Sequence, residues 1–211
     1  MSPDQISAQL RASLEGQLSD PEGRVHVETM LSALGALAGF GCQMAVREAV
    51  KAGRLNPDGA LVEVTTEDGG TYYFGDQINQ PLLEAPISVW KLIAGAAQHA
   101  GAKELPDILE IVRHVSASVG GGGFGVLTVN AKNQPHEAPF EALKTYWPSA
   151  HALIRSLNGD PIMMGWFFAG AAQSVIVDAR QVIDPALGCR IVMEAAVAMS
   201  KVDPRAIGVE V

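Results

Sequence analysis

The feature that most constrains this chain is a long helical pattern, from about Val25 to Ala52, whose middle contains three glycines. Apolar residues recur at helical spacing on both sides of the segment Gly35–Gly41, and Gly53 is placed to end the helix. In an exposed helix each glycine costs about 1 kcal/mol relative to alanine. Three of them together therefore predict a compensating contact, most simply the backbone of another helix at close approach.

A short small-residue motif occurs twice more in the chain. Residues 94–98 and 169–173 both read Ala-Gly-Ala-Ala-Gln, each with a tryptophan just upstream, and a looser copy lies within the long helix. In a helix the glycine and the glutamine of each motif lie on one face. One interpretation is helix packing in which the glutamines satisfy backbone groups; the other is a pocket for a polar ligand. The candidate ligand-binding residues are Gln43, Trp90, Gln98, Trp166 and Gln173.

The glycines of the two exact motif copies are expected to lie at tight helix contacts. Gly95 and Gly170 lack a Cβ atom, so a neighbouring backbone or ring can approach more closely than alanine would allow. If these contacts exist, leucine at either position must push helices apart or force neighbouring side chains off their rotamers.

Residues 61–78 change from a helical to an alternating pattern. Leu61–Thr66 and Thr71–Phe74 are rich in β-branched and aromatic residues, and an acidic, glycine-containing turn joins them. This pattern predicts a β-hairpin. A lone hairpin is marginal in water, so it must rest on helices, gain a strand or pair with another chain. Val126–Val129 is the obvious further strand candidate, and the rings on both faces of the hairpin fit a core contact and a subunit contact equally.

The remaining chain is predicted to be helical. A first short helix starts at Pro3, with Ser2 as its N-cap, and is expected to end at Gly16. Further helical patterns occupy about 87–100, 106–119, 139–157, 161–181 and 184–200. The predicted fold is mainly α with a β-hairpin, α+β in the loose sense, with helices packed through Gly/Ala faces. We expect a single domain over residues 1–211.

The glycine-rich run Gly120–Gly125 follows a predicted helix. A phosphate-binding loop needs a strand before it and a helix after it, and usually a closing Lys with Ser or Thr; none of these is present. Gly120 is expected to provide a left-handed helix C-cap. The rest of the loop is either a plain connector anchored by its phenylalanine or a lid over a pocket. The candidate lid residues are Gly121, Gly122, Gly123 and Phe124.

Catalytic and metal-binding signatures are not evident in the sequence. The histidines are scattered, and Glu110 and His114 form an ordinary helical pair that needs no metal. The HExxH, GxSxG and CxxC motifs are absent. Cys42 and Cys189 are expected to be buried, unpaired and without a catalytic part. We therefore expect no metal and no cofactor, and no catalytic residue can be assigned.

The charge balance bears on possible partners. The chain has 23 acidic and 15 basic residues, a net charge of −8, and no basic run, which argues against nucleic acid binding. The N-terminal residues lack the basic region of a signal peptide. Two apolar, charge-free stretches, 29–46 and 161–177, are shorter than the ~20 residues that a membrane span needs, so we interpret them as buried helices. The expected location is the cytoplasm.

Two functional hypotheses follow from these observations. The first is a soluble, non-catalytic homo-oligomer, most simply a two-fold dimer, whose hairpin or Gly/Ala helices form the subunit contact. The second is a small-molecule binding protein or enzyme, with its pocket between the two tryptophan-containing motif helices and beneath the loop Gly120–Gly125.

Overall fold

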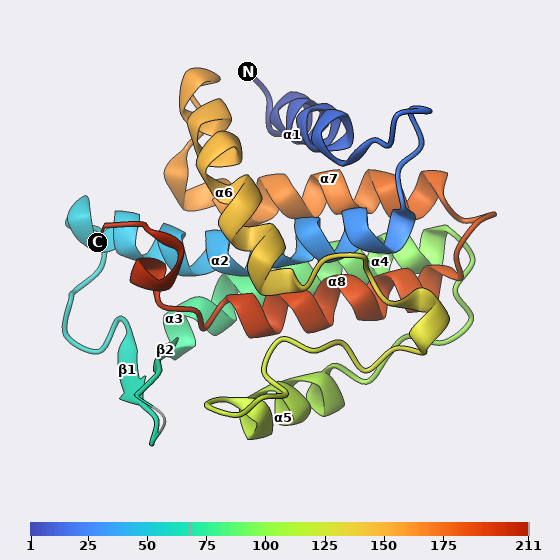
Figure 1. Cartoon of the computed structure of the whole chain (residues 1–211). Helices are drawn as coiled ribbons and strands as arrows, with labels where there is room; N and C mark the ends of the chain where they lie inside the picture. Colours follow the sequence, from blue (N-terminus) through green and yellow to red (C-terminus); the bar gives the residue numbers. More distant parts are fainter. Residues whose placement is uncertain (68, 211) are drawn as a thin grey trace.

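The computed structural model describes residues 1–67 and 69–210 and shows a mainly α fold with a β-hairpin, as the sequence predicts (Figure 1). The longer helices are α1 (Pro3–Leu18), α2 (Val27–Lys51), α4 (Val89–His99), α5 (Ile108–Ser118), α6 (Pro139–Ser156), α7 (Met164–Asp178) and α8 (Pro185–Met199). The shorter elements are α3 (Asp76–Asn79), η1 (Gln80–Glu84), η2 (Ala131–Asn133), η3 (Pro161–Met163), η4 (Pro204–Ile207), β1 (Val62–Thr65) and β2 (Thr71–Phe74).

Several helices begin where a capping residue precedes a proline. Ser2 caps α1 in a capping box with Gln5, and Asp184 accepts a hydrogen bond from the second residue of α8. The predicted end of α1 at Gly16 is wrong, because the helix continues to Leu18. Gly16 is exposed and has open space around it, so the helix passes through it at the modest cost of one glycine.

Helix α2 forms the centre of the molecule and lies between α7 and α8 (Figure 1). It is long and apolar enough to cross a membrane, but its most apolar window is wholly buried by the rest of the fold. The predicted close approach of another backbone is confirmed here. A Cβ atom on Gly35 would lie 2.9 Å from the Cα atom of Val192 on α8, and one on Gly39 would lie 2.7 Å from the Cα atom of Ala196.

The tight contacts predicted for the exact motif copies are found at one position and not at the other. Gly95 on α4 is exposed, and a Cβ atom there would meet nothing within 4 Å, so the prediction is wrong at this residue. At Gly170 on α7 a Cβ atom would come within 2.6 Å of the Oγ atom of Ser7 on α1. The same local motif therefore faces solvent on α4 and a neighbouring helix on α7.

The hairpin is antiparallel and gains a further short pairing from the chain after α8. Val62 lies opposite Phe74, and Val64 opposite Tyr72. The N–H group of Tyr73 donates to the carbonyl oxygen of Lys201 (2.9 Å), so β2 is covered on both edges and β1 is the outer strand. The hairpin thus rests on the helical body through β2.

The predicted strand Val126–Val129 is wrong, because these residues form no strand. Its polar groups bond to side chains instead of a neighbouring strand. The N–H group of Thr128 donates to Oε2 of the buried Glu194 on α8 (2.6 Å), and its hydroxyl bonds the same carboxylate. The carbonyl oxygens of Leu127 and Val129 accept hydrogen bonds from Gln134.

Candidate ligand-binding pocket

Two of the predicted glutamines satisfy backbone acceptors of neighbouring segments. Gln43 is buried, and its Nε2 donates to the carbonyl oxygens of Ser200 (3.1 Å) and Val202 (3.0 Å) at the end of α8. The Nε2 of Gln173 donates to the carbonyl oxygen of Leu92 on α4 (2.9 Å). These amides therefore tie helices together, as the packing interpretation expects.

The other predicted site residues lie in different surroundings. Gln98 is exposed near the end of α4, and Trp90 is half-buried at the start of the same helix. Trp166 lies in the first turn of α7 and lines an apolar pocket. The structure therefore does not bring the five residues together, and Trp166 alone among them borders this pocket.

The Trp166 pocket has a volume of about 270 Å³ and lies between α2 and the segments on either side of it. Its walls are almost entirely apolar. They come from α2, from the loop after it, from α3 with η1, and from η3 with α7. The lining residues are Ala45, Val46, Ala49, Leu55, Gln77, Gln80, Pro81, Ala85, Ile162 and Trp166. The Nε1 atom of Trp166 is buried and has no hydrogen-bond partner within residues 1–67 and 69–210.

One wall of this pocket contains a π-helical turn. Helix α3 continues at Gln80 into η1, whose hydrogen bonds have π-helical spacing. Pro81 lies within it, has no N–H group to donate, and faces the pocket. Gln80 is held at the surface by a hydrogen bond from its Nε2 to Oε2 of Glu84 (2.7 Å). Turns of this kind are rare and often occur at functional sites.

The glycine-rich loop lies beside the hairpin and contributes no wall of the Trp166 pocket. Gly120 has the positive φ expected of it, 74°, but the C-cap of α5 is Val119, which lies between the last helical residue, Ser118, and Gly120. The ring of Phe124 packs edge-on against Tyr72, 5.0 Å between centroids, which confirms its role as an anchor. Phe124 and Phe140 both line two further pockets, of about 440 and 210 Å³. The loop residues Gly121, Gly122 and Gly123 lead to this anchor.

A buried amine lies under the hairpin. Lys201 follows α8, is 6% exposed, and its Nζ atom is 4.6 Å from the ring centroid of Phe74. Burial lowers the pKa of Lys201 to about 8. Lys201 does not line the Trp166 pocket. Its burial was not anticipated from sequence, because a lysine just beyond a helix end usually points into solvent.

The thiols and acidic groups give no reactive centre. Cys42 and Cys189 are free and buried, as predicted, and burial raises the pKa of each thiol to about 12. Both are therefore protonated at neutral pH. Within the part of the chain that the structure describes, no three His, Cys, Asp or Glu side chains gather as metal ligands.

Sequence reasoning missed most of the pocket walls. Gln77 and Gln80 stand one helical turn apart immediately before a proline, and this spacing is the one signal that could have drawn attention to them. Comparison with protein-family models, curated proteins and solved structures found no match for this chain.

Proposed function

We propose that this protein binds a small, mainly apolar molecule that carries a hydrogen-bond acceptor, with the Trp166 pocket as the binding site. The observation that supports this most directly is the buried, unpartnered indole N–H group of Trp166, a residue that lines an otherwise apolar pocket. A buried donor without an acceptor costs about 1–3 kcal/mol, which a ligand oxygen or nitrogen would recover. The volume of about 270 Å³ lies near the lower end for ligand pockets, so the ligand is small.

The test compares fragments that differ in one acceptor. Acetophenone and similar small ketones are screened by thermal shift beside hydrocarbons of the same shape, because a ligand that binds the folded state raises the melting temperature. We expect ketones to bind more tightly than their hydrocarbon partners. Trp166→Phe keeps a ring but removes the donor, so it should weaken ketone binding by about 5- to 150-fold, the equivalent of about 1–3 kcal/mol.

The control is Trp90→Phe, since Trp90 lies outside the pocket lining. This variant should leave ketone binding unchanged. Equal affinity of the ketone for the parent protein and for Trp166→Phe would exclude the indole N–H group as the recognition element. An absence of saturable binding by every fragment would exclude the pocket.

A second candidate function is self-association through β1, and the exposure of this strand supports it. All residues of β1 are exposed, and Val62 and Val64 are 50% and 37% exposed on the same face as Tyr72 and Phe74. Within the described chain the outer edge of β1 has no strand partner. Such an edge favours antiparallel pairing with a second copy around a two-fold axis.

We expect sedimentation equilibrium to show a dimer at micromolar concentrations, and Val64→Lys to shift the population to monomer. Lysine on an exposed strand edge disfavours pairing with another chain. Val182→Lys is the matched control, because Val182 is exposed in the turn before α8 and away from the hairpin. A parent protein that sediments as a 22.2 kDa monomer would remove this candidate.

The cellular setting that we propose is the cytoplasm, with neither a membrane nor a nucleic acid as partner. Two buried free thiols suit a reducing compartment. The enclosure of α2 by other helices supports a water-soluble protein, since a membrane span exposes its apolar surface to lipid. The net charge of −8 would repel a polyanion.

A further inference from the structure

Arg47 is a half-buried arginine with no acidic partner. It projects from the last turns of α2, and its guanidinium carbon lies 4.4 Å from the ring centroid of Tyr73 on β2. Its Nε and Nη2 atoms are buried and have no hydrogen-bond partner in the described chain. These two nitrogens form one edge of the guanidinium group, the edge that can donate two parallel hydrogen bonds to one carboxylate.

The other two half-buried arginines of the described chain, Arg11 and Arg190, each have acidic partners. The Arg11 side chain is 25% exposed and pairs with Glu15 (2.7 Å) and Asp178. The Arg190 side chain is 27% exposed and pairs with Glu110 (3.3 Å) and Glu194 (3.1 Å). Removing a guanidinium from water is costly unless an anion and hydrogen bonds compensate for it. Arg47 is similarly half-buried, but no anionic side chain among the described residues pairs with its guanidinium group.

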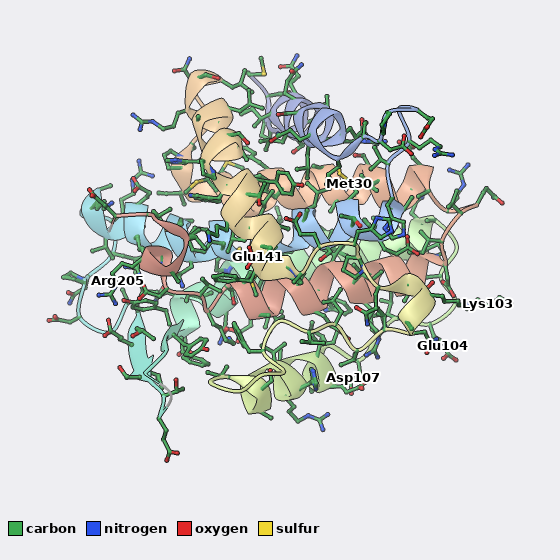
Figure 2. All side chains as sticks on the ribbon, viewed as in Figure 1. Met30, Lys103, Glu104, Asp107, Glu141 and Arg205 are labelled. Carbon is green, nitrogen blue, oxygen red and sulfur yellow. The ribbon has the colours of Figure 1, made fainter. Side chains whose placement is uncertain are left out.

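The two acidic groups that act on Tyr73, whose ring lies against Arg47, bind other partners. Glu63 accepts a hydrogen bond from the hydroxyl of Tyr73 (2.8 Å). The pKa of Tyr73 is raised, mainly by burial and next by this bond, while a side-chain hydrogen bond from Arg47 acts in the opposite direction. Asp203 is paired with Arg205 (2.9 Å), which is labelled in Figure 2 on the segment after α8. No carboxylate of the described chain lies within ion-pair distance of Arg47.

Arg47 also lines a second pocket, of about 190 Å³, at the end of α2. The other walls are Val50, Lys51, Pro57, Ala60 and Leu61. This pocket shares no lining residue with the Trp166 pocket, although the loop after α2 contributes to both. Its chemistry is different, because two cationic side chains stand beside an apolar wall. Lys51 reaches Glu48 at 3.4 Å, but it is exposed and this surface pair is weak.

We propose that this second pocket binds a small organic carboxylate, with the carboxylate group at the guanidinium of Arg47 and the hydrocarbon part against Val50, Pro57 and Leu61. The planar edge fits both carboxylate and phosphate. The apolar wall favours a carboxylate with a hydrocarbon tail over inorganic phosphate. Lys51 adds a second positive charge at the mouth. The site is independent of the function proposed for the Trp166 pocket.

The test uses hexanoate as the probe, with hexanol and inorganic phosphate as the comparison ligands, all on the full chain. Titration is followed by the side-chain Nε–H signal of Arg47 in nitrogen–proton NMR spectra and by the melting temperature. We expect hexanoate to shift the Arg47 signal saturably, and hexanol and phosphate to bind at least tenfold more weakly. Hydrogen bonds between charged groups are strong enough for that ratio.

Arg47→Met keeps the length of the side chain and removes the donors, so it should weaken hexanoate binding by about tenfold or more. Arg47→Lys keeps the charge without the two-donor edge and should also weaken it, which provides a test if the methionine variant folds poorly. Arg54→Met is the matched control on the neighbouring loop and should bind hexanoate like the parent chain.

Three results would overturn this site. The first is hexanoate binding that Arg47→Met and Arg47→Lys leave unchanged, and the second is a parent chain with no saturable response to hexanoate. The third is phosphate binding tighter than hexanoate binding, which would replace the carboxylate assignment by a phosphate site. Ketone binding at Trp166 is measured separately, so failure of either site is distinguishable from failure of the other.

Discussion

Gly39 and Gly95 have similar local sequences and opposite surroundings, and substitution by alanine should separate them. At Gly39 a Cβ atom would collide with the backbone of Ala196, which cannot rotate away. We expect Gly39→Ala to lower the free energy of unfolding by at least about 1–3 kcal/mol. Gly95 faces open space, so Gly95→Ala should raise it by up to about 1 kcal/mol through helix propensity.

Urea unfolding of both variants beside the parent chain measures these changes. Gly95→Ala serves as the control for the substitution itself, since the same chemical change is made without a neighbour. If Gly39→Ala proved as stable as the parent protein, α2 and α8 would have to be more loosely packed than the structure shows.

At the scale of residues, the sequence predicted a helix face made of small residues and a glutamine, but it did not predict which of these faces is covered by another helix. Small residues and a glutamine on one helix face do recur, and Gln43 and Gln173 do bond to neighbouring backbone groups. Whether a given glycine is covered depends on which helix crosses it, and this is decided by residues far away in the chain. Gly95 and Gly170 have identical motif neighbours, so no local signal distinguishes them.

At the scale of elements, the start of α2 is coupled to the segment before α6 by two stacked imidazole rings. His26 and His136 lie 3.8 Å apart between centroids, with 12° between their planes. The hydroxyl of Thr29 hydrogen-bonds to both residues: to the Nδ1 atom of His26 (2.8 Å), and to the backbone N–H group of His136, from which it accepts (2.9 Å). Burial lowers the pKa of His26, and His136 lowers it further, while Glu28 acts in the opposite direction.

This lowered pKa predicts a loss of stability in acid. Above about pH 6.5 the His26 ring is neutral in the folded and the unfolded chain, and its contribution is complete. As the pH falls below that value the unfolded chain takes up the proton first, so the free energy of unfolding decreases. His26→Phe keeps a ring on His136 and cannot titrate; it should lose less stability between about pH 7 and pH 5.

Chemical unfolding at the two pH values checks this prediction. The exposed His99, replaced by Gln, provides the control and should follow the parent chain. An unchanged pH dependence in His26→Phe would mean that the acid sensitivity lies elsewhere.

The segment Val126–Val129 shows where prediction of elements fails. Its residue types favour a strand, but its backbone groups bond to the side chains of Glu194 and Gln134 and not to a neighbouring strand. Strand propensity describes how well a residue suits a strand, and it does not say which segment or side chain its backbone groups will bond to. The π-helical turn at Gln80–Glu84 is missed for a related reason, because a proline there signals the end of a helix.

For the whole molecule, fold class followed from the sequence because helical periodicity and capping residues are local signals. Asp184 before Pro185 fixes the start of α8 in the sequence and in the structure. The pockets could not be predicted in the same way. The Trp166 pocket takes its walls from α2, η1, η3 and α7, and only their arrangement creates it. The single domain stays a prediction, supported by the contacts of α2 with helices from the far end of the chain.

The enclosure of α2 has a consequence for how the protein must be made. Its main coverings, α7 and α8, are translated long after it, and α8 ends 148 residues beyond Lys51. At roughly 5–20 residues per second this leaves the helix uncovered for about 7–30 s on the ribosome. During that time a segment apolar enough to pass as a membrane span has no native partner. Slower translation would therefore lengthen the time during which α2 is exposed to aggregation or mistargeting.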